Sequence, residues 1–419
     1  MKKNIVTCGD WWIYAIAALA SVWFIVFGPI CQSADSASYV SAWTESVSHG
    51  HIDIYRTPAY PLYLGMALGV SESSGLLLAV AGQHIVFLVS LYYLKKMLLA
   101  FTRSRGIACA AVLMYVLAVI KWNNYILTES LSISGMVFLF YWLLTYWREG
   151  GRLAVAMSAV WLVVLLMLRP SFVYLLPVCA LAWGLFCRRH GRHALLGIAA
   201  VAVAGVIEAG YCKCYEARYG MFTPTGVTSI NNFQIAVLEG AVSPDYTHEP
   251  QVKEYLDSLP NFYRKTMQDY KAYYLEHPSP AALTHQEEAR IVSRSRSDQP
   301  GKWVLACWHH LFDSRSMMFP EPPQALAVVF SMLPLTMSAA YVLLLVYMAL
   351  CCYWMLWKRR LPVMSIVMWA AVAGNVATIL IGAQAEWPRL LSPAIPLLTV
   401  MCVQLLGFIN PKAIASYNE

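Results

Sequence analysis

The stretch GLLLAVAGQHIVFLVSLYYLKKML, residues 75–98, predicts a helix that crosses a lipid bilayer. A membrane-spanning helix needs roughly 17–25 predominantly apolar residues, and this run has that length, with two lysines near its end. Runs of the same character recur along the chain. Together they predict an all-α polytopic membrane protein of about ten transmembrane helices, at about 11–30, 75–98, 106–121, 125–147, 153–169, 171–187, 193–211, 325–352, 361–382 and 390–409.

The composition agrees with a chain that lies mostly in lipid. Of its 419 residues, 59% are hydrophobic and 13% are charged, whereas soluble domains carry about 25% charged residues. The net charge is +7. Because basic residues in a membrane protein report its orientation, this charge does not indicate a nucleic-acid partner.

The basic residues divide unequally between alternate loops, which predicts the orientation. The short outer loops hold only Arg56, Lys121, Arg169 and Arg389. Positive residues favour the cytoplasmic side, so we expect both termini to lie inside. The run 11–30 lacks a cleavage site and is expected to be retained as the first span. The basic residues of the inner loops are Lys2, Lys3, Lys95, Lys96, Arg103, Arg105, Arg148, Arg152, Arg188, Arg189, Arg192, Lys358, Arg359, Arg360 and Lys412.

Two polar regions interrupt the apolar runs and suggest a division of the chain. Residues 1–211 are expected to form an N-terminal transmembrane module that includes a first outer loop at 31–65. Residues 212–324, called the outer segment here, are expected to form a mainly helical outer loop domain. Its stretches 250–275 and 283–312 have helical periodicity, and the pattern leaves open a compact domain or a partly mobile cap. Residues 325–419 carry the C-terminal transmembrane helices.

The first outer loop is too polar to span a membrane but is rich in aromatic residues. Tyr39, Val40 and Trp43 share one face of a predicted amphipathic helix at the outer interface. Pro58 and Pro61 are expected to prevent a regular helix at the return into the membrane, because proline removes a backbone donor.

The eleven cysteines of the chain do not have the spacing of a metal site. Cys212, Cys214 and Cys307 are expected on the outer side, where a disulfide between Cys307 and one of the other two would join the ends of the outer segment. The sequence does not choose between these pairings.

Ionisable residues from distant segments are expected to meet at the outer membrane surface. Placing an ionisable side chain within the membrane costs free energy, so the residues found there usually serve a function. Several of these residues have an ordinary structural alternative. Arg56 could contact headgroups, and Glu129 could cap a helix. Arg169 could be an interfacial anchor, and Glu386 could form a local ion pair with Arg389. Their common surface nevertheless predicts an outward-facing polar site. The residues are Asp35, Glu45, Asp53, Arg56, Glu129, Arg169, Glu208, Glu386 and Arg389.

The stretches DSASYVSAWTES (35–46) and YRTPAYPLYLG (55–65) resemble the first outer loop of membrane glycosyltransferases of the GT-C superfamily. The resemblance is to the bacterial branch related to protein O-mannosyltransferases and the lipid A aminoarabinose transferase, which shows Asp-x-x-x-Tyr and then Arg or Lys before Pro. It continues, in the family's order, at QHIVFLVSLYYL (83–94), NNYILTESLSI (123–133), LRPSFVYLLP (168–177) and WPRLLSPAIPLL (387–398). The outer segment resembles nothing that we can name.

This resemblance implies inverting transfer of a sugar from a polyprenyl-phosphate donor to a glycan, lipid or protein acceptor. The reaction would occur at the outer face of the bacterial cytoplasmic (inner) membrane, toward the periplasm. Asp35 matches the position of the catalytic acid and is expected to be the base, with Asp53 and Glu129 as further catalytic candidates. Arg56 matches the Arg or Lys before Pro and would bind the donor phosphate, with Arg389 and then Arg169 as further candidates.

Other residues and one departure complete the expected site. Tyr39, Tyr55, Tyr60 and Glu386 are expected to line the substrate site. Many relatives carry a second acid directly after the first, whereas here Ser36 follows Asp35. A divalent metal is therefore unsupported, and no cofactor is assigned.

Three other functional classes compete with this interpretation. A polysaccharide polymerase or ligase would also use lipid-linked sugars at the outer face, but its donors are pyrophosphate-linked glycans. A lipid or glycan transporter would favour internal repeats and charged residues at mid-membrane, and a structural scaffold would need no outward polar site.

Overall fold

The computed structural model describes residues 10–262, 267–312, 337–357, 362–383 and 387–409, in which the regular elements are all helices and no β-sheet is present. A helix occupies each of the ten predicted apolar runs. They are α1 (Trp11–Phe27), α4 (Gly75–Phe101), α5 (Arg105–Val119), α6 (Glu129–Glu149), α7 (Arg152–Leu168), α8 (Leu175–His190), α9 (Leu195–Tyr219), α16 (Met337–Leu356), α17 (Val363–Gly382) and α19 (Ile395–Ile409).

The predicted all-α polytopic fold class is confirmed. Within the described residues, six segments are long and apolar enough to cross a membrane: Gly75–Phe101, Arg105–Asn124, Glu129–Glu149, Pro170–Tyr219, Val363–Gly382 and Arg389–Leu406. The stretch Pro170–Tyr219 contains both α8 and α9 and has 50 residues, enough for two crossings. The helices α1, α7 and the described part of α16 are shorter apolar helices, so the number of ten spans stays a prediction.

The first outer loop forms the expected surface helix and then a second helix that the sequence analysis missed. The first, α2 (Ala34–His49), begins with a capping box between Ser33 and Ser36 and ends at Gly50, whose φ is +64°. The second, α3 (Ala59–Val70), begins directly after Pro58 and includes Pro61. The expectation that these prolines prevent a helix was wrong, because the first turn of a helix has no acceptors for its N–H groups and therefore tolerates proline.

The two loop helices pack closely against each other. A Cβ atom placed on Gly65 of α3 would lie 2.0 Å from the indole ring of Trp43 on α2. Only glycine therefore allows this approach, which holds α2 beside α3 at the end of the bundle.

The outer segment has a hydrophobic core of its own. Its helices are α10 (Val227–Leu238), α11 (Pro250–Ser258), α12 (Met267–Glu276), α13 (His285–Asp298) and α14 (Pro300–Phe312). Phe233, Tyr255, Ile291 and their neighbours form this core, separate from the main core of the bundle. The helix α9 continues to Tyr219, past the expected boundary at residue 211, so the outer segment is joined to the bundle by a continuous helix.

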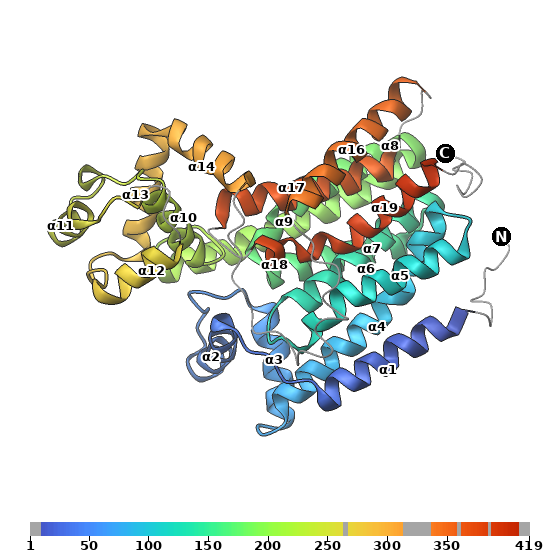
Figure 1. Cartoon of the computed structure of the whole chain (residues 1–419), viewed down its shortest axis with the longest axis horizontal. Helices are drawn as coiled ribbons and strands as arrows, with labels where there is room; N and C mark the ends of the chain where they lie inside the picture. Colours follow the sequence, from blue (N-terminus) through green and yellow to red (C-terminus); the bar gives the residue numbers. More distant parts are fainter. Residues whose placement is uncertain (1–9, 263–266, 313–336, 358–361, 384–386, 410–419) are drawn as a thin grey trace.

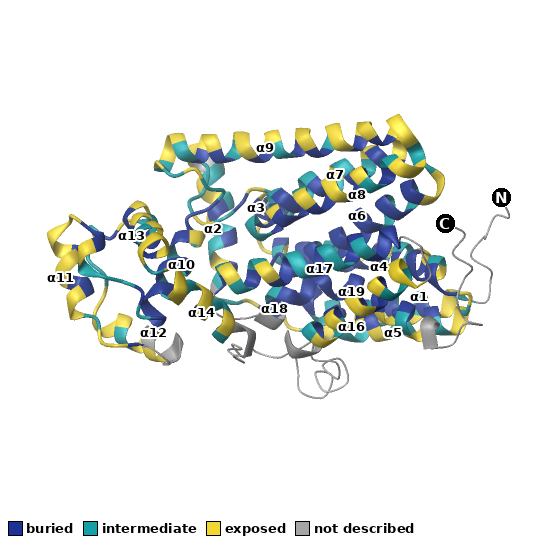
Figure 2. Cartoon of the chain, turned by 90° about the horizontal axis from the view of Figure 1, so that it is seen from above, coloured by how far each residue is buried: buried dark blue, intermediate teal, exposed yellow. Residues whose placement is uncertain are grey.

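Figure 1 shows the bundle with the outer segment and α2 at one end, whereas α1 begins and α19 ends toward the opposite end. Figure 2 shows that α9 lies along one edge with an exposed face, while α4, α6 and α17 carry much of the buried surface in the middle. The small helix α18 (Trp387–Leu391), which carries Arg389, lies between α17 and α19 in the chain.

The disulfide that the sequence left possible is not formed among the described residues, because Cys212, Cys214 and Cys307 are all free. Cys212 is buried on α9, whereas the Sγ atom of Cys307 on α14 lies 3.9 Å from the carbonyl oxygen of Leu380, at the end of α17. The two ends of the described outer segment therefore attach to different helices of the bundle, α9 and α17.

Candidate active site

The start of the first outer loop is attached to the segment before α6. The backbone N–H of Cys31 donates to the carbonyl of Asn124 at 2.8 Å, and the N–H of Ile126 donates to the carbonyl of Cys31 at 3.0 Å. The Ser36 hydroxyl then donates to the carbonyl of Ile126 at 2.9 Å. These bonds place Asp35, at the start of α2, next to Glu129, at the start of α6.

Polar residues in the middle of α4 hold that segment in place. The Gln83 side-chain amide donates to the carbonyls of Asn123 and Tyr125, at 2.8 and 3.0 Å. The His84 ring lies 2.8 Å from the Asn124 side-chain oxygen. Both polar side chains of α4 are fully buried, so the GQH triplet in an otherwise apolar span anchors the floor of the site.

Asp35 links two arginines that are far apart in the sequence. Its Oδ1 atom accepts a hydrogen bond from Arg56 Nη2 at 2.7 Å, and its Oδ2 atom accepts one from Arg389 Nη2, also at 2.7 Å. The Asp35 side chain is 32% exposed, whereas Arg389 is 7% exposed. Asp35 is thus the accessible carboxylate of the cluster, and both of its oxygens contact cations.

Glu129 forms the buried side of the same cluster. Its Oε1 atom accepts from Arg389 Nε at 2.7 Å and lies 3.3 Å from Arg169 Nη2. The Glu129 side chain is fully buried. Its Oε2 atom and Arg169 Nη1 are buried without a hydrogen-bond partner among the described residues. Because buried polar atoms in folded proteins normally form hydrogen bonds, these two atoms require an explanation.

These five side chains define the charge cluster: Asp35, Arg56, Glu129, Arg169 and Arg389. They come from α2, the loop before α3, the start of α6, the end of α7 and α18. Within the described part of the chain the cluster has three positive and two negative groups.

The arginines change the acidity of Asp35. Burial raises the pKa of the Asp35 carboxyl, but the charges of Arg389 and Arg56 outweigh that effect and lower the pKa to about 2. Asp35 is therefore ionised at neutral pH and, while both arginines hold it, only weakly basic.

Two residues of α2 orient Arg56. Arg56 Nε donates to the Ser38 hydroxyl at 2.7 Å, and the guanidinium lies over the Tyr39 ring, 4.3 Å from its centroid. The Tyr39 ring in turn packs edge-to-face against Tyr60, whose hydroxyl donates to Gln83 at 2.9 Å. Tyr39 thus borders the cluster, while Tyr60 is buried below it and links it to α4.

The structure places other predicted site residues outside the charge cluster. Asp53 Oδ1 accepts the backbone N–H groups of Tyr55 and Arg56, at 2.8 and 2.7 Å, and thereby shapes the loop that carries Arg56. The Tyr55 hydroxyl lies 3.4 Å from His285 Nε2 in the outer segment. Glu208 is buried on α9, and Glu386 lies outside the described residues.

Ser36 directly follows Asp35, and it has a structural role here. Its hydroxyl accepts the N–H of Ser33 at 2.9 Å in the capping box while it donates to Ile126. In the described ranges, no three His, Cys, Asp or Glu side chains come together as metal ligands would.

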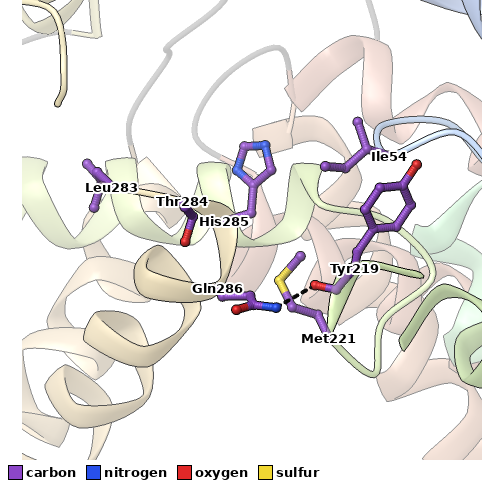
Figure 3. Close-up of a pocket in the computed structure, with 7 residues that line it drawn as sticks. All are labelled: Ile54, Tyr219, Met221, Leu283, Thr284, His285 and Gln286. Atoms are coloured by element: carbon purple, nitrogen blue, oxygen red, sulfur yellow. Dashed lines mark hydrogen bonds between the residues drawn. The ribbon is translucent and has the colours of Figure 1, made fainter. Parts of the chain in front are cut away.

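A cavity of about 460 Å³ lies where the first outer loop meets the outer segment. Figure 3 shows Ile54 and Tyr219 on one side of it and Leu283 and Thr284 on the other. The Gln286 amide donates to the Tyr219 carbonyl at 2.7 Å at its base. Sequence reasoning missed this cavity because its residues come from three segments without a recognisable motif.

No family model and no curated protein sequence matches the chain. Among solved structures, the chain is similar to arabinosyltransferase EmbB from Mycobacterium smegmatis, with a TM-score of 0.40 and 14% sequence identity over 98% of this chain. The chain spans 42% of the length of that protein. A similarity this low establishes neither a family nor a function.

Proposed function

We propose that this protein is an inverting membrane glycosyltransferase that transfers a sugar from a polyprenyl-monophosphate donor to an acceptor hydroxyl. The proposal places the reaction at the charge cluster, on the outer face of a bacterial cytoplasmic membrane. The acceptor class is a glycan, a lipid or a protein.

The observation that carries the proposal is the pair of arginines that share Asp35. Arg56 and Arg389 both contact the accessible carboxylate at 2.7 Å, on the rim of a membrane helix bundle. Two guanidinium groups converging on one anion form a preorganised anion site, and guanidinium groups pair well with phosphate oxygens. The ordered sequence motifs resembling GT-C enzymes supply the reaction class.

The charge of the cluster supports a monophosphate donor over a pyrophosphate donor. Three arginines and two carboxylates leave one excess positive charge among the described residues of the cluster. A sugar phosphodiester carries one negative charge, whereas a sugar diphosphate diester carries two. The monophosphate would therefore neutralise the cluster, which distinguishes this proposal from the polymerase or ligase alternative.

The reaction requires a base and a stabilised leaving group. The acceptor oxygen attacks the anomeric carbon, the bond from that carbon to the phosphate oxygen breaks, and the polyprenyl phosphate leaves with the electron pair. Its developing negative charge would be stabilised by Arg56 and Arg389. The acceptor proton passes to a carboxylate within hydrogen-bond reach.

Among the three candidate carboxylates, Asp35 is best placed to be the base. Glu129 is fully buried between two arginines, and Asp53 accepts two backbone hydrogen bonds. Asp35 is exposed enough to contact an acceptor. A donor phosphate that competes for Arg56 and Arg389 would free Asp35 from its two cations and increase its basicity.

The experiment is transfer from radiolabelled polyprenyl-monophosphate sugars in proteoliposomes, supplied with acceptors extracted from cells. Wild type is compared with Asp35→Asn and Arg56→Ala, and with Glu45→Gln as a matched control on the exposed face of α2. We expect the first two variants to lose at least about a hundredfold in activity, while the control keeps wild-type activity.

Each outcome of this experiment has a definite meaning. Full activity of Asp35→Asn would show that Asp35 is not the base and would favour Asp53 or Glu129 in that role. Transfer by wild type from pyrophosphate-linked donors alone would support the polymerase alternative. No transfer from either donor class would refute the proposed function.

A further inference from the structure

The residues 51–57, called the strap here, connect α2 to α3 and carry Arg56 toward the charge cluster. The Arg56 side chain is held by α2, through Asp35 and Ser38. The position of its backbone depends on the rest of the strap, which has no regular helix or strand.

The outer segment binds the strap through its main-chain carbonyls. The Tyr219 hydroxyl donates to the carbonyl of Ile52 at 2.5 Å, and the Tyr215 hydroxyl donates to the carbonyl of Ile54 at 2.8 Å. The Thr225 hydroxyl donates to the carbonyl of Tyr55 at 2.7 Å. Three hydroxyl groups separated from the strap by more than 160 residues thus hold the backbone up to the residue before Arg56.

The packing at this junction is close. The backbone N–H of Gly226 also donates to the carbonyl of Ile54, at 2.8 Å. A Cβ atom on Gly226 would lie 3.1 Å from the Tyr215 hydroxyl and 3.2 Å from the Ile54 carbonyl oxygen. Tyr215 is fully buried and Thr225 is 2% exposed, so these hydrogen bonds are shielded from competing water.

The strap therefore has two fixed sides. Asp53 satisfies the backbone N–H groups of Tyr55 and Arg56 from within the strap, and the outer segment satisfies the carbonyls. A shift of the outer segment would move these carbonyls and, with them, the guanidinium beside Asp35. The pocket shown in Figure 3 borders the same contacts, because Ile54 and Tyr219 line it.

We infer that Tyr215, Tyr219 and Thr225 are positioning residues, through which the outer segment holds Arg56 in register for the donor phosphate. The inference rests on the proposed role of Arg56 as a phosphate ligand. It assigns to the outer segment a function at the donor site, which it reaches through its contacts with the strap.

The test measures donor binding and turnover separately. The double variant Tyr215→Phe/Thr225→Val removes two hydroxyl donors without removing Arg56. Binding of polyprenyl monophosphate in nanodiscs should weaken about tenfold, because Arg56 is then held less firmly in the position that contacts the phosphate. The KM for the monophosphate donor should rise by a similar factor, while kcat at saturating donor stays within about twofold of wild type.

Two controls separate positioning from general loss of structure. Tyr211→Phe removes a hydroxyl one turn earlier on α9, which has no hydrogen-bond partner among the described residues, and it should bind the phosphate as wild type does. Thr225→Ser keeps the donor hydroxyl. The double variant Tyr215→Phe/Thr225→Ser should therefore bind the phosphate more tightly than Tyr215→Phe/Thr225→Val.

A thermodynamic cycle with Arg56 gives the decisive readout. In an Arg56→Ala background, the double variant should no longer change phosphate binding, because the strap then has no guanidinium to position. An equal loss in both backgrounds, or wild-type binding by the double variant, would overturn the inference while leaving the proposed function intact. If wild type itself binds no polyprenyl monophosphate, the proposed function fails first.

Discussion

The buried and exposed sides of the charge cluster are built differently. On the buried side, Glu129 is fully enclosed and pairs with Arg169 and Arg389, which are less than a tenth exposed. On the exposed side, Asp35 and Arg56 come from a surface helix and the strap, and the Asp35 side chain is 32% exposed. Arg389 touches both carboxylates. Under the proposed function, the buried side would fix the geometry, while the exposed side would exchange its partners with substrate.

The largest expected effect comes from removing the buried carboxylate charge. Glu129→Gln leaves Arg169 and Arg389 without their shared anion, and breaking a buried ion pair typically destabilises a protein by about 3–5 kcal/mol. We expect a loss of this size in the free energy of unfolding, measured in mixed micelles. Glu216→Gln, in an exposed pair with Lys213, should change it by less than about 1 kcal/mol. Equal losses in the two variants would contradict a structural role for the buried side.

The next effect compares the two arginines that contact Asp35. Lysine cannot bridge two carboxylates with a rigid fork of donors, so Arg389→Lys should lose about 10²–10³-fold in kcat/KM. Arg56→Lys keeps a cation on the exposed side of the cluster, and we expect about a tenfold loss. Initial rates of sugar transfer at several donor concentrations measure both. A larger loss for Arg56→Lys than for Arg389→Lys would contradict the greater importance assigned to Arg389, the arginine that contacts both carboxylates.

The third effect concerns the pH dependence of the exposed side. With Asp35 at a pKa of about 2 in the free protein, its carboxylate is ionised throughout pH 5–8. Protonation of Asp35 should therefore not lower kcat/KM at the acid end of that range. A bound phosphate that displaces Asp35 from the arginines raises its pKa, because opposite charges beside a carboxyl lower it by about 1–3 units.

The acid limb of kcat should therefore appear about 1–2 pH units higher than that of kcat/KM. Protonation of Asp35 removes the base, so the rate falls as the pH decreases through the raised pKa. The measurement is a pair of pH–rate profiles with saturating and limiting donor. Coincident acid limbs would mean that the donor does not take the arginines from Asp35.

The smallest effect tests how the exposed side is attached to the bundle. Ser36→Ala removes the hydrogen bond to the Ile126 carbonyl and one arm of the capping box, which should lower the free energy of unfolding by about 1–2 kcal/mol. Ser41→Ala, on an exposed part of α2, should have almost no effect. A thermal unfolding series distinguishes them, and equal midpoints would show that Ser36 does not stabilise the start of α2.

Local sequence patterns predicted the membrane helices and the first surface helix of this protein. The apolar runs predicted the membrane helices, because burial in lipid requires long continuous segments that are visible without tertiary knowledge. The helix at Ala34–His49 was also predictable, since its apolar face has helical periodicity and Gly50 ends it. The helix at Ala59–Val70 was missed because proline was interpreted as a helix breaker at a position where it starts a helix.

The candidate site was only partly predictable. Asp35, Arg56, Glu129, Arg169 and Arg389 were each identified from motif order and membrane position, but their pairing was not. The contribution of Gln83 and His84 could have been suspected, since two polar residues in the middle of an apolar span need buried partners. The hydroxyls of Tyr215 and Thr225 gave no such signal, because tyrosine and threonine near a helix end are common.

The sequence by itself determined that the chain is a polytopic helical membrane protein and identified the charged groups from which a polar site can form, since hydropathy and charge placement are local properties. Only the tertiary structure decided that Asp35 joins Arg56 to Arg389, that Glu129 is enclosed between two arginines, and that the outer segment holds the strap. These contacts join residues up to 354 positions apart. Pairing at such separations depends on how whole helices pack, and no local pattern records it.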